Sequence, residues 1–250
     1  MADFKIGNTT PSSGKLKVGN VEVKKLYNGA TLIWQNAFVF TTRAQLDTAI
    51  NLWISDNAAA LATYGEINTW RFEANTSLAN FSSLFLNKDT FNSDISNWDV
   101  SNVTDMRSMF EDASSFNQSL NSWNTGSVTK TGFMFRDATS FNGDISSWDV
   151  SNVTDMQDMF FRASVFNQNL GSWDVSNVTD MGNMIYLTAI NTTNYDALLT
   201  GWNALTLQSN VQFGAIGVEY CSTAAQNART NIINTYNWTI SDEGQAVGCP

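Results

Sequence analysis

A 25-residue internal repeat is the feature that most constrains this chain. Five columns of apolar residues recur at that spacing, and each column has one member in each of four units. The columns are Trp98, Trp123, Trp148 and Trp173; Phe91, Phe116, Phe141 and Phe166; Val103, Val128, Val153 and Val178; Met109, Met134, Met159 and Met184; and Ile95, Leu120, Ile145 and Leu170. A fixed period of roughly 20 to 29 residues is typical of leucine-rich-repeat solenoids, whose units bury their apolar faces against one another.

Each unit is predicted to contain a short helix and then a short extended segment. In residues 101–110, apolar residues have helical spacing behind Ser101, a good helix-capping residue. Residues 116–123 combine apolar spacing with turn-forming flanks, and such segments stack in parallel about 4.8 Å apart. We therefore expect an α/β fold, a leucine-rich-repeat-type solenoid of about 4–5 turns over residues 67–190.

Two sets of polar residues accompany the apolar columns. An asparagine column consists of Asn92, Asn117, Asn142 and Asn167. With the tryptophan column, we interpret it as a structural ladder in which each amide bonds the backbone of the next turn; the alternative is a row of sugar-binding amides. The candidate ligand contacts are variable polar positions of the extended segment, namely Asp94, Ser119, Asp144 and Asn169.

The segments that flank the repeat are expected to cap it. Residues 39–66 predict a helical N-terminal cap, because Thr42 and Gln45 have capping-box spacing ahead of an apolar helical face. Residues 191–250 predict an α+β C-terminal cap, with helices near residues 195–202 and 223–236 and a strand at 211–213.

The two cysteines of the chain, Cys221 and Cys249, both lie in the C-terminal cap. A disulfide between them would remove about 3 to 4 kcal/mol of unfolded-chain entropy in the loop-closure model. We expect a structural disulfide formed in an oxidising medium. A catalytic thiol is disfavoured, because the chain has no histidine to activate it.

Residues 1–38 differ from the rest of the chain. Three stretches alternate apolar and polar residues between glycine-containing breaks, which predicts a small β-meander. Five lysines face two carboxylates in this segment, a net charge of +3, whereas the whole chain carries −10. We expect the segment to dock on an acidic partner. The expected docking residues are Lys15, Lys17, Lys24, Lys25 and Tyr27.

Charge and composition disfavour several classes of function. The net charge of −10 argues against nucleic acid or an anionic membrane as the main partner. No apolar run is long enough to span a membrane. The absence of histidine removes the usual general base and the commonest metal ligand.

Carboxylates are the remaining catalytic or metal-binding candidates. Pairs such as Asp99 and Asp105 recur in several units, which favours a role in folding over a single active site, so we expect neither enzymatic activity nor a cofactor. Calcium is a minor candidate at Asp99, Asp149 and Asp174, a partial column that Asn124 interrupts.

The repeat closely resembles that of a known family. Residues 98–106, 148–156 and 173–181 read Trp-Asp-Val-Ser-Asn-Val-Thr-Asp-Met, which resembles the BspA-like leucine-rich-repeat surface proteins of bacteria. The resemblance extends through the C-terminal cap and covers residues 39–250. The third unit departs from the motif at Lys130 and Thr131. Members of this family are mostly adhesins, so the resemblance implies binding to a host or matrix surface.

The N-terminal segment resembles a different group. Residues 24–34, which read Lys-Lys-Leu-Tyr-Asn-Gly-Ala-Thr-Leu-Ile-Trp, are similar to strands at the start of bacteriophage virion proteins. With an initial Met and no secretory signal, this resemblance favours a virion surface protein, either a capsid fibre or decoration or a tail-fibre tip. We expect a homo-oligomer that docks on other virion proteins and displays the repeat to a host protein or glycan. The alternative is a secreted bacterial cell-surface adhesin whose signal has been removed.

Overall fold

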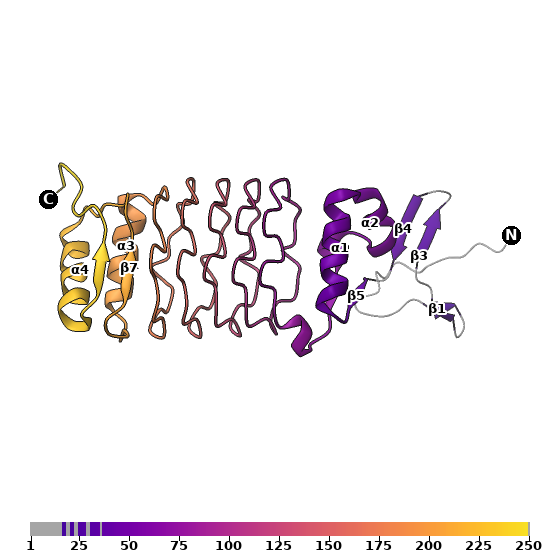
Figure 1. Ribbon diagram of the computed structural model, residues 1–250, viewed down its shortest axis with the longest axis horizontal. Helices are drawn as coiled ribbons and strands as arrows, with labels where there is room; N and C mark the ends of the chain where they lie inside the picture. The colour runs from indigo at the N-terminus through magenta and orange to yellow at the C-terminus, as the bar shows by residue number, and fades with distance from the viewer. Residues whose placement is uncertain (1–16, 19–20, 23–24, 29–30, 36, 250) are drawn as a thin grey trace.

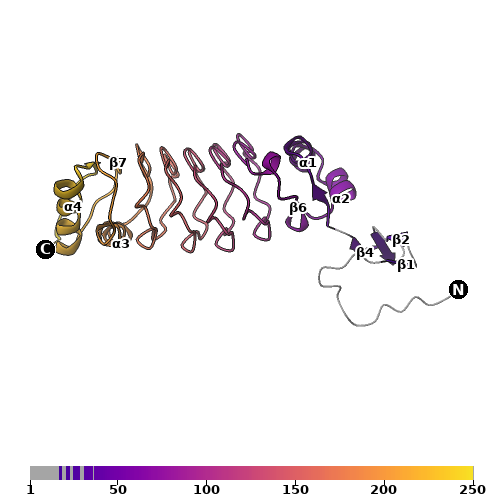
Figure 2. The same ribbon diagram turned by 90° about the horizontal axis from the view of Figure 1, so that it is seen from below.

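The computed structural model describes residues 17–18, 21–22, 25–28, 31–35 and 37–249, and side chains from residue 37 onward. Coil loops from the middle of the chain lie side by side, with helices α1 and α2 at one end and α3 and α4 at the other (Figures 1 and 2). The helices are α1 (Arg43–Ser55), α2 (Asn57–Tyr64), η1 (Ile67–Thr69), η2 (Thr76–Leu78), α3 (Thr192–Asn203) and α4 (Thr223–Tyr236). The strands are β1 (Lys17–Val18), β2 (Val21–Glu22), β3 (Lys25–Asn28), β4 (Thr31–Gln35), β5 (Val39–Phe40), β6 (Arg71–Phe72), β7 (Gln212–Gly214) and β8 (Thr239–Ser241).

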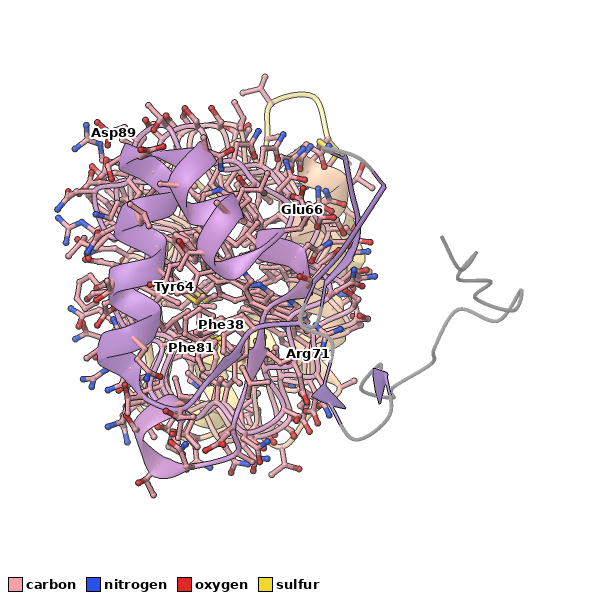
Figure 3. All side chains as sticks on the ribbon, turned by 90° about the vertical axis from the view of Figure 1, so that its right-hand side faces the viewer. Phe38, Tyr64, Glu66, Arg71, Phe81 and Asp89 are labelled. Carbon is pink, nitrogen blue, oxygen red and sulfur yellow. A yellow bond between two sulfur atoms is a disulfide. The ribbon has the colours of Figure 1, made fainter. Side chains whose placement is uncertain are left out.

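Helices α1 and α2 cover the first end of the loops. The capping box expected before α1 is present: the Thr42 side chain accepts from the Gln45 N–H, and the Gln45 side chain accepts from the Thr42 N–H at 3.3 Å. Phe38 and Tyr64, the last residue of α2, pack edge to face with ring centroids 4.9 Å apart (Figure 3). Their contact extends the aromatic core to helix α2.

The predicted α/β leucine-rich-repeat-type solenoid is wrong. Between residues 79 and 191 the chain forms neither an α-helix nor a β-strand, and the strands of the described ranges pair only in two-stranded sheets. The helix expected over residues 101–110 is a series of turns, and residues 116–123 contain no strand. Single parallel bridges instead join neighbouring units at one column. That column is Asn80, Asp105, Lys130, Asp155 and Asp180.

Left-handed backbone conformation explains why no helix forms. Ser108 and Asp112 have φ angles of 54° and 58°, and a right-handed helix cannot pass through such residues. Their N–H groups donate to carbonyls of the next unit, at Gly132 (3.0 Å) and Arg136 (2.9 Å). The same conformation recurs at Ser83, Asn87, Phe133, Asp137, Asp158, Arg162, Asn183 and Leu187.

Aromatic stacks fill the space inside the units. Phe110, Phe135 and Phe160 follow one another with centroids 5.3 and 5.6 Å apart and planes within 3° of parallel. The Trp148 ring lies in a second stack and its Nε1–H donates to the Leu120 carbonyl at 2.9 Å, so its polar atom is satisfied inside the core. The apolar columns of the sequence are therefore the core of the molecule.

The asparagine column bonds neighbouring units along one edge. The Asn92 Oδ1 accepts from the Asn117 N–H at 2.9 Å, and the Asn117 Oδ1 accepts from the Asn142 N–H at 2.8 Å. The Asn142 Oδ1 accepts from the Asn167 N–H at 2.9 Å and also from the Gln168 Nε2 at 2.8 Å. These side chains supply the acceptors that a β-sheet would otherwise provide.

The last unit continues into the C-terminal segment. The Ile185 N–H donates to the Gly214 carbonyl of β7 at 3.1 Å, and β7 pairs in parallel with β8. A Cβ on Gly214 would lie 2.3 Å from the Asn183 backbone nitrogen, so only glycine permits this approach. Cys221 and Cys249 form a disulfide with an S–S distance of 2.01 Å.

A buried ion pair lies between α4 and the residues that follow β8. The Asp242 side chain is 1% exposed and accepts from Arg229 Nε at 2.8 Å and Nη2 at 2.9 Å. The Tyr195 hydroxyl donates to the same carboxylate at 2.7 Å. Burial and then the charge of Asp242 raise the pKa of Tyr195 well above its ordinary value.

The N-terminal strands form two separate hairpins, and the single meander expected for residues 1–38 is wrong. Strands β1 and β2 pair antiparallel with Val18 opposite Val21, and β3 and β4 pair antiparallel with Asn28 opposite Thr31. Within the described ranges, β1 and β2 form one two-stranded sheet and β3 and β4 form another, and no strand joins the two.

Replacing Asn142 by alanine should lower the free energy of unfolding by about 1 kcal/mol, because the Asn167 N–H loses its acceptor. Asn142→Asp keeps an oxygen at that position and should retain most of this stability. Urea unfolding followed by tryptophan fluorescence measures both changes. Equal losses in the two variants would show that the acceptor is unimportant.

The variant Asp242→Asn should destabilise the protein by about 3 kcal/mol, because Arg229 keeps a charge in a largely buried site. The control is Asp174→Asn, at an exposed carboxylate that accepts one turn hydrogen bond from the Ser176 N–H. Its effect should stay within about 0.5 kcal/mol. Calorimetric unfolding of both variants tests the difference, and similar losses would contradict a structural role for the buried pair.

Candidate functional site

The ligand contacts expected from the sequence are used in local turns. In this column a side-chain oxygen accepts from the N–H two residues further on. The pairs are Asp94 with Ser96 (2.9 Å), Ser119 with Asn121 (3.5 Å), Asp144 with Ser146 (2.9 Å) and Asn169 with Gly171 (2.9 Å). These four residues therefore shape the backbone of their own units.

The minor calcium column has the same kind of role. Asp99 and Asp149 each accept a hydrogen bond from a serine hydroxyl at 2.6 Å, from Ser101 and Ser151. These bonds, followed by those from the serine N–H groups, lower the pKa of both carboxyls. Within residues 37–249, no three acidic or cysteine side chains gather in a group that could hold a metal ion.

The expected docking residues fall where side chains are not described. Lys15 and Lys24 lie outside the described residues. Lys17 belongs to β1, and Lys25 and Tyr27 belong to β3. In those strands Lys17 pairs with Glu22, Lys25 with Gln35 and Tyr27 with Leu32.

A different set of positions carries side chains that change from unit to unit. We call this set the variable strip. It consists of Arg107, Gly132, Gln157 and Gly182; Ser108, Phe133, Asp158 and Asn183; Glu111, Arg136, Phe161 and Tyr186; and Asp112, Asp137, Arg162 and Leu187. The apolar columns barely change over the same units. Packing in the core therefore does not determine which residues occupy the strip.

At its first end, the strip holds a salt bridge beside a hollow. The Arg107 guanidinium donates to Asp105 at 2.6 Å through Nη2. Burial pushes the pKa of Asp105 upward, but the hydrogen bonds and charge of Arg107 outweigh burial and leave that pKa lowered. The pKa of Arg107 is raised by the same pair. The hollow of about 300 Å³ is lined by Ser82, Ser83, Arg107, Ser108 and Phe133.

In the middle of the strip, Arg136 lies between two aromatic rings. Its Cζ is 5.7 Å from the centroid of Phe133 and 5.1 Å from that of Phe161, within cation–π range. Phe161 in turn stacks on Tyr186 at 4.9 Å, with the planes 14° apart. All four side chains are only partly buried, so the cluster presents aromatic and cationic surface to solvent.

Asp158 lies beneath this cluster with an unused hydrogen-bond acceptor. Its Oδ2 is 3.4 Å from Arg136 Nη1, whereas its buried Oδ1 has no partner within the described part of the chain. The residue is 7% exposed and has a positive φ of 52°. The positive φ is shared with the equivalent positions of the other units, whereas a buried oxygen without a hydrogen-bond partner is unusual in a folded protein.

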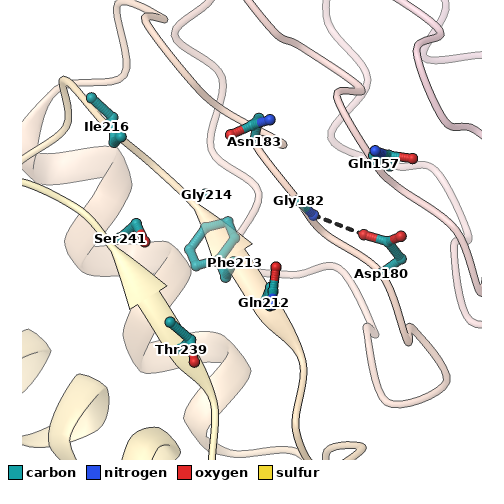
Figure 4. Close-up of a pocket in the computed structure, with 10 residues that line it drawn as sticks. All are labelled: Gln157, Asp180, Gly182, Asn183, Gln212, Phe213, Gly214, Ile216, Thr239 and Ser241. Carbon is teal, nitrogen blue, oxygen red and sulfur yellow. Dashed lines mark hydrogen bonds between the residues drawn. The ribbon is translucent and has the colours of Figure 1, made fainter.

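The strip ends in a polar groove beside β7 and β8 (Figure 4). Gln157, Gly182 and Asn183 from the strip contribute to its wall, together with Asp180. The whole strip thus combines aromatic, guanidinium, carboxylate and amide groups, which suits recognition better than proton transfer.

Variation of residue type within a column is the sequence signal that indicates this strip, and polarity alone does not reveal it. Equivalent positions 111, 136, 161 and 186 carry Glu, Arg, Phe and Tyr, so this column changes from acidic to basic to aromatic along the chain. Positions that pack one unit against the next keep the same residue in every unit. A column that varies this much is therefore not required for that packing.

None of the helices in the described ranges is long and apolar enough to cross a membrane. Comparison with curated proteins found no match, and neither did comparison with solved structures. One protein family does match the chain, over residues 54–159 and 128–213, and its description is "Mycoplasma protein of unknown function, DUF285". The match is consistent with the BspA-like resemblance of the repeat and does not reach the N-terminal segment. Because it covers more than half of the 250 residues, this protein belongs to the DUF285 family.

Proposed function

We propose that the protein is a non-enzymatic binding module displayed on a virion surface, as a capsid fibre or decoration or a tail-fibre tip. In this proposal the N-terminal segment docks on other virion proteins, in a homo-oligomer, and the variable strip attaches to a host surface protein or glycan. The observation that carries the proposal is the partly exposed cluster of Phe133, Arg136, Phe161 and Tyr186.

The composition of this cluster supports a binding role. Tyrosine and arginine are enriched at the energetic centres of protein interfaces, and a partly buried aromatic stack offers contact area at low entropic cost. Arg136 is held by charges on three sides, with Glu111 at 3.9 Å, Asp137 at 3.6 Å and Asp158 at 3.4 Å. The aromatic surface is therefore pre-organised before a partner arrives.

Two observations support the absence of catalysis as part of the proposal. The chain has no histidine to act as a general base. The recurrent carboxylates Asp99 and Asp149 are engaged by serine hydroxyls and stabilise turns.

A secreted bacterial cell-surface adhesin is the second candidate, and the family match favours it. The matching family is described as a Mycoplasma protein, and the BspA-like proteins that the repeat resembles are bacterial surface proteins. The disulfide between Cys221 and Cys249 is compatible with an oxidising extracellular site in either case. The two candidates share the adhesive strip and differ in what residues 1–38 contact.

The variant Tyr186→Ala should weaken attachment to the target surface by at least about tenfold, because it removes half of the aromatic stack and leaves the contacts of Arg136 and Asp158 in place. Arg71→Ala, at an exposed residue outside the strip, serves as the control and should leave binding unchanged. Adhesion of purified protein to host cells or envelopes measures both. Normal attachment by the Tyr186 variant would contradict the proposed contact.

Deleting residues 1–36 should abolish incorporation into virions while leaving the thermal unfolding of the remaining chain nearly unchanged, because Phe38 and its contact with Tyr64 are kept. Light scattering should show loss of the oligomer, and imaging of particles should show loss of the protein. A truncated chain that still enters particles would contradict docking by this segment. Attachment of the full chain to bacterial cells, with no particle containing it, would support the adhesin candidate.

A further inference from the structure

The groove at the C-terminal end of the variable strip has a lining unlike the aromatic cluster. It has a volume of about 380 Å³, within the usual range of roughly 300 to 1,000 Å³ for small-ligand sites. It lies over β7 and β8 and against the last two repeat units (Figure 4). Its lining consists of Gln157, Asp180, Gly182, Asn183, Gln212, Phe213, Gly214, Ile216, Thr239 and Ser241.

Most polar side chains in this lining are not used by the fold. Asn183, Gln212 and Thr239 are exposed, and their side chains make no hydrogen bond within the described part of the chain. The side chains of Gln157, which is half-buried, and Ser241, which is exposed, also make no hydrogen bond within the described part of the chain. Amides and hydroxyls both donate and accept hydrogen bonds, so the groove offers matched partners to a ligand that does both.

The charge of the groove selects against anions. Asp180 is its one ionisable lining residue, and no lysine or arginine is among the described residues that form its wall. The Asp180 Oδ1 accepts from the Gly182 N–H at 3.0 Å, which fixes the carboxylate and leaves Oδ2 for a ligand (Figure 4). A phosphate, sulfate or uronic acid would meet a carboxylate with no balancing cation.

The floor and wall of the groove add apolar surface. Ile216 is 39% exposed, and glycines at 182 and 214 leave the floor low. Strand β7 is paired on both sides, because Phe213 bridges Met181 in the last unit and pairs with Ile240 of β8. A peptide therefore cannot extend strand β7 on this floor.

We propose that this groove binds a neutral saccharide of one to a few pyranose units. The ring hydroxyls pair with the free amides, the hydroxyls and Asp180 Oδ2, and the C–H face of the sugar lies against Ile216. This inference rests on the proposed surface-binding function and names the ligand class of one part of the strip.

Position 182 provides a variant that the fold tolerates. A Cβ at Gly182 would lie 3.4 Å from Asp180 Oδ1 and 3.8 Å from Gln157 Cγ, which are ordinary contacts. The equivalent position one unit earlier is Gln157, so Gly182→Gln places in the groove a side chain that the repeat already accommodates. It should fill the floor and block a sugar ring.

A second pair of variants tests the carboxylate. Asp180 and Asp174 each accept from the N–H two residues further on, both at 3.0 Å, and both are exposed. Asp180→Asn and Asp174→Asn therefore remove the same charge from the same kind of turn, but only Asp180 lines the groove.

The test is titration of the full chain with neutral tetrasaccharides of glucose, mannose, galactose and N-acetylglucosamine, alongside their sulfated counterparts, by calorimetry. We expect a neutral saccharide to bind, and Gly182→Gln and Asp180→Asn to weaken it at least about tenfold while Asp174→Asn leaves it unchanged. Preference for the sulfated forms, binding that survives Gly182→Gln, or no saccharide binding at all would overturn the inference. If the wild-type chain still attaches to its target surface and Tyr186→Ala abolishes that attachment, the proposed function stands without it.

Discussion

Hydrogen bonds from each unit to the next are the interaction on which the rest of the structure depends. The Phe110 N–H donates to the Met134 carbonyl, the Phe135 N–H to Met159 and the Phe160 N–H to Met184, each at 2.8 Å. Since the units contain no helix or strand, these donors have no partner within their own unit. A buried N–H without an acceptor is costly, so one unit cannot fold alone and both ends of the series need a cap. Helix α1 caps one end of the series, and strand β7 caps the other.

The same bonds set a constant step between units, and the step explains the core and the variable strip together. Identical side chains at identical positions fall 5.2 to 5.6 Å apart in the Phe85, Phe110, Phe135 and Phe160 stack. Those columns can change little, because one smaller ring would leave a void against two neighbours. Side chains directed away from the core carry no such penalty and are open to differ from unit to unit. The groups proposed for recognition therefore occur at positions where packing between units does not require the same residue in every unit.

Sequence reasoning predicted the burial pattern well and the backbone poorly. The tryptophan, phenylalanine and methionine columns are buried, the asparagine column bonds successive units, and the cysteines are bridged. The predicted helix failed because apolar spacing reports which side chains face the core and says nothing about the sign of φ. Serine at 108 and phenylalanine at 133 both adopt left-handed backbone, and no residue preference reveals that for phenylalanine. Asp94 and Asp144 were chosen as ligand contacts for their polarity, although a short polar side chain most often closes a turn.

Alternation of large and small side chains in one column of the strip helps to form the C-terminal groove. One of its columns reads Arg107, Gly132, Gln157 and Gly182, so a long side chain is followed each time by none. The first hollow includes Arg107 in its lining and the C-terminal groove includes Gln157 and Gly182. Arg136 and Phe161, which belong to another column of the strip, lie between the two hollows. A regular backbone thus acquires distinct subsites through a few substitutions in two columns, which leaves the inter-unit hydrogen bonds and the aromatic core undisturbed.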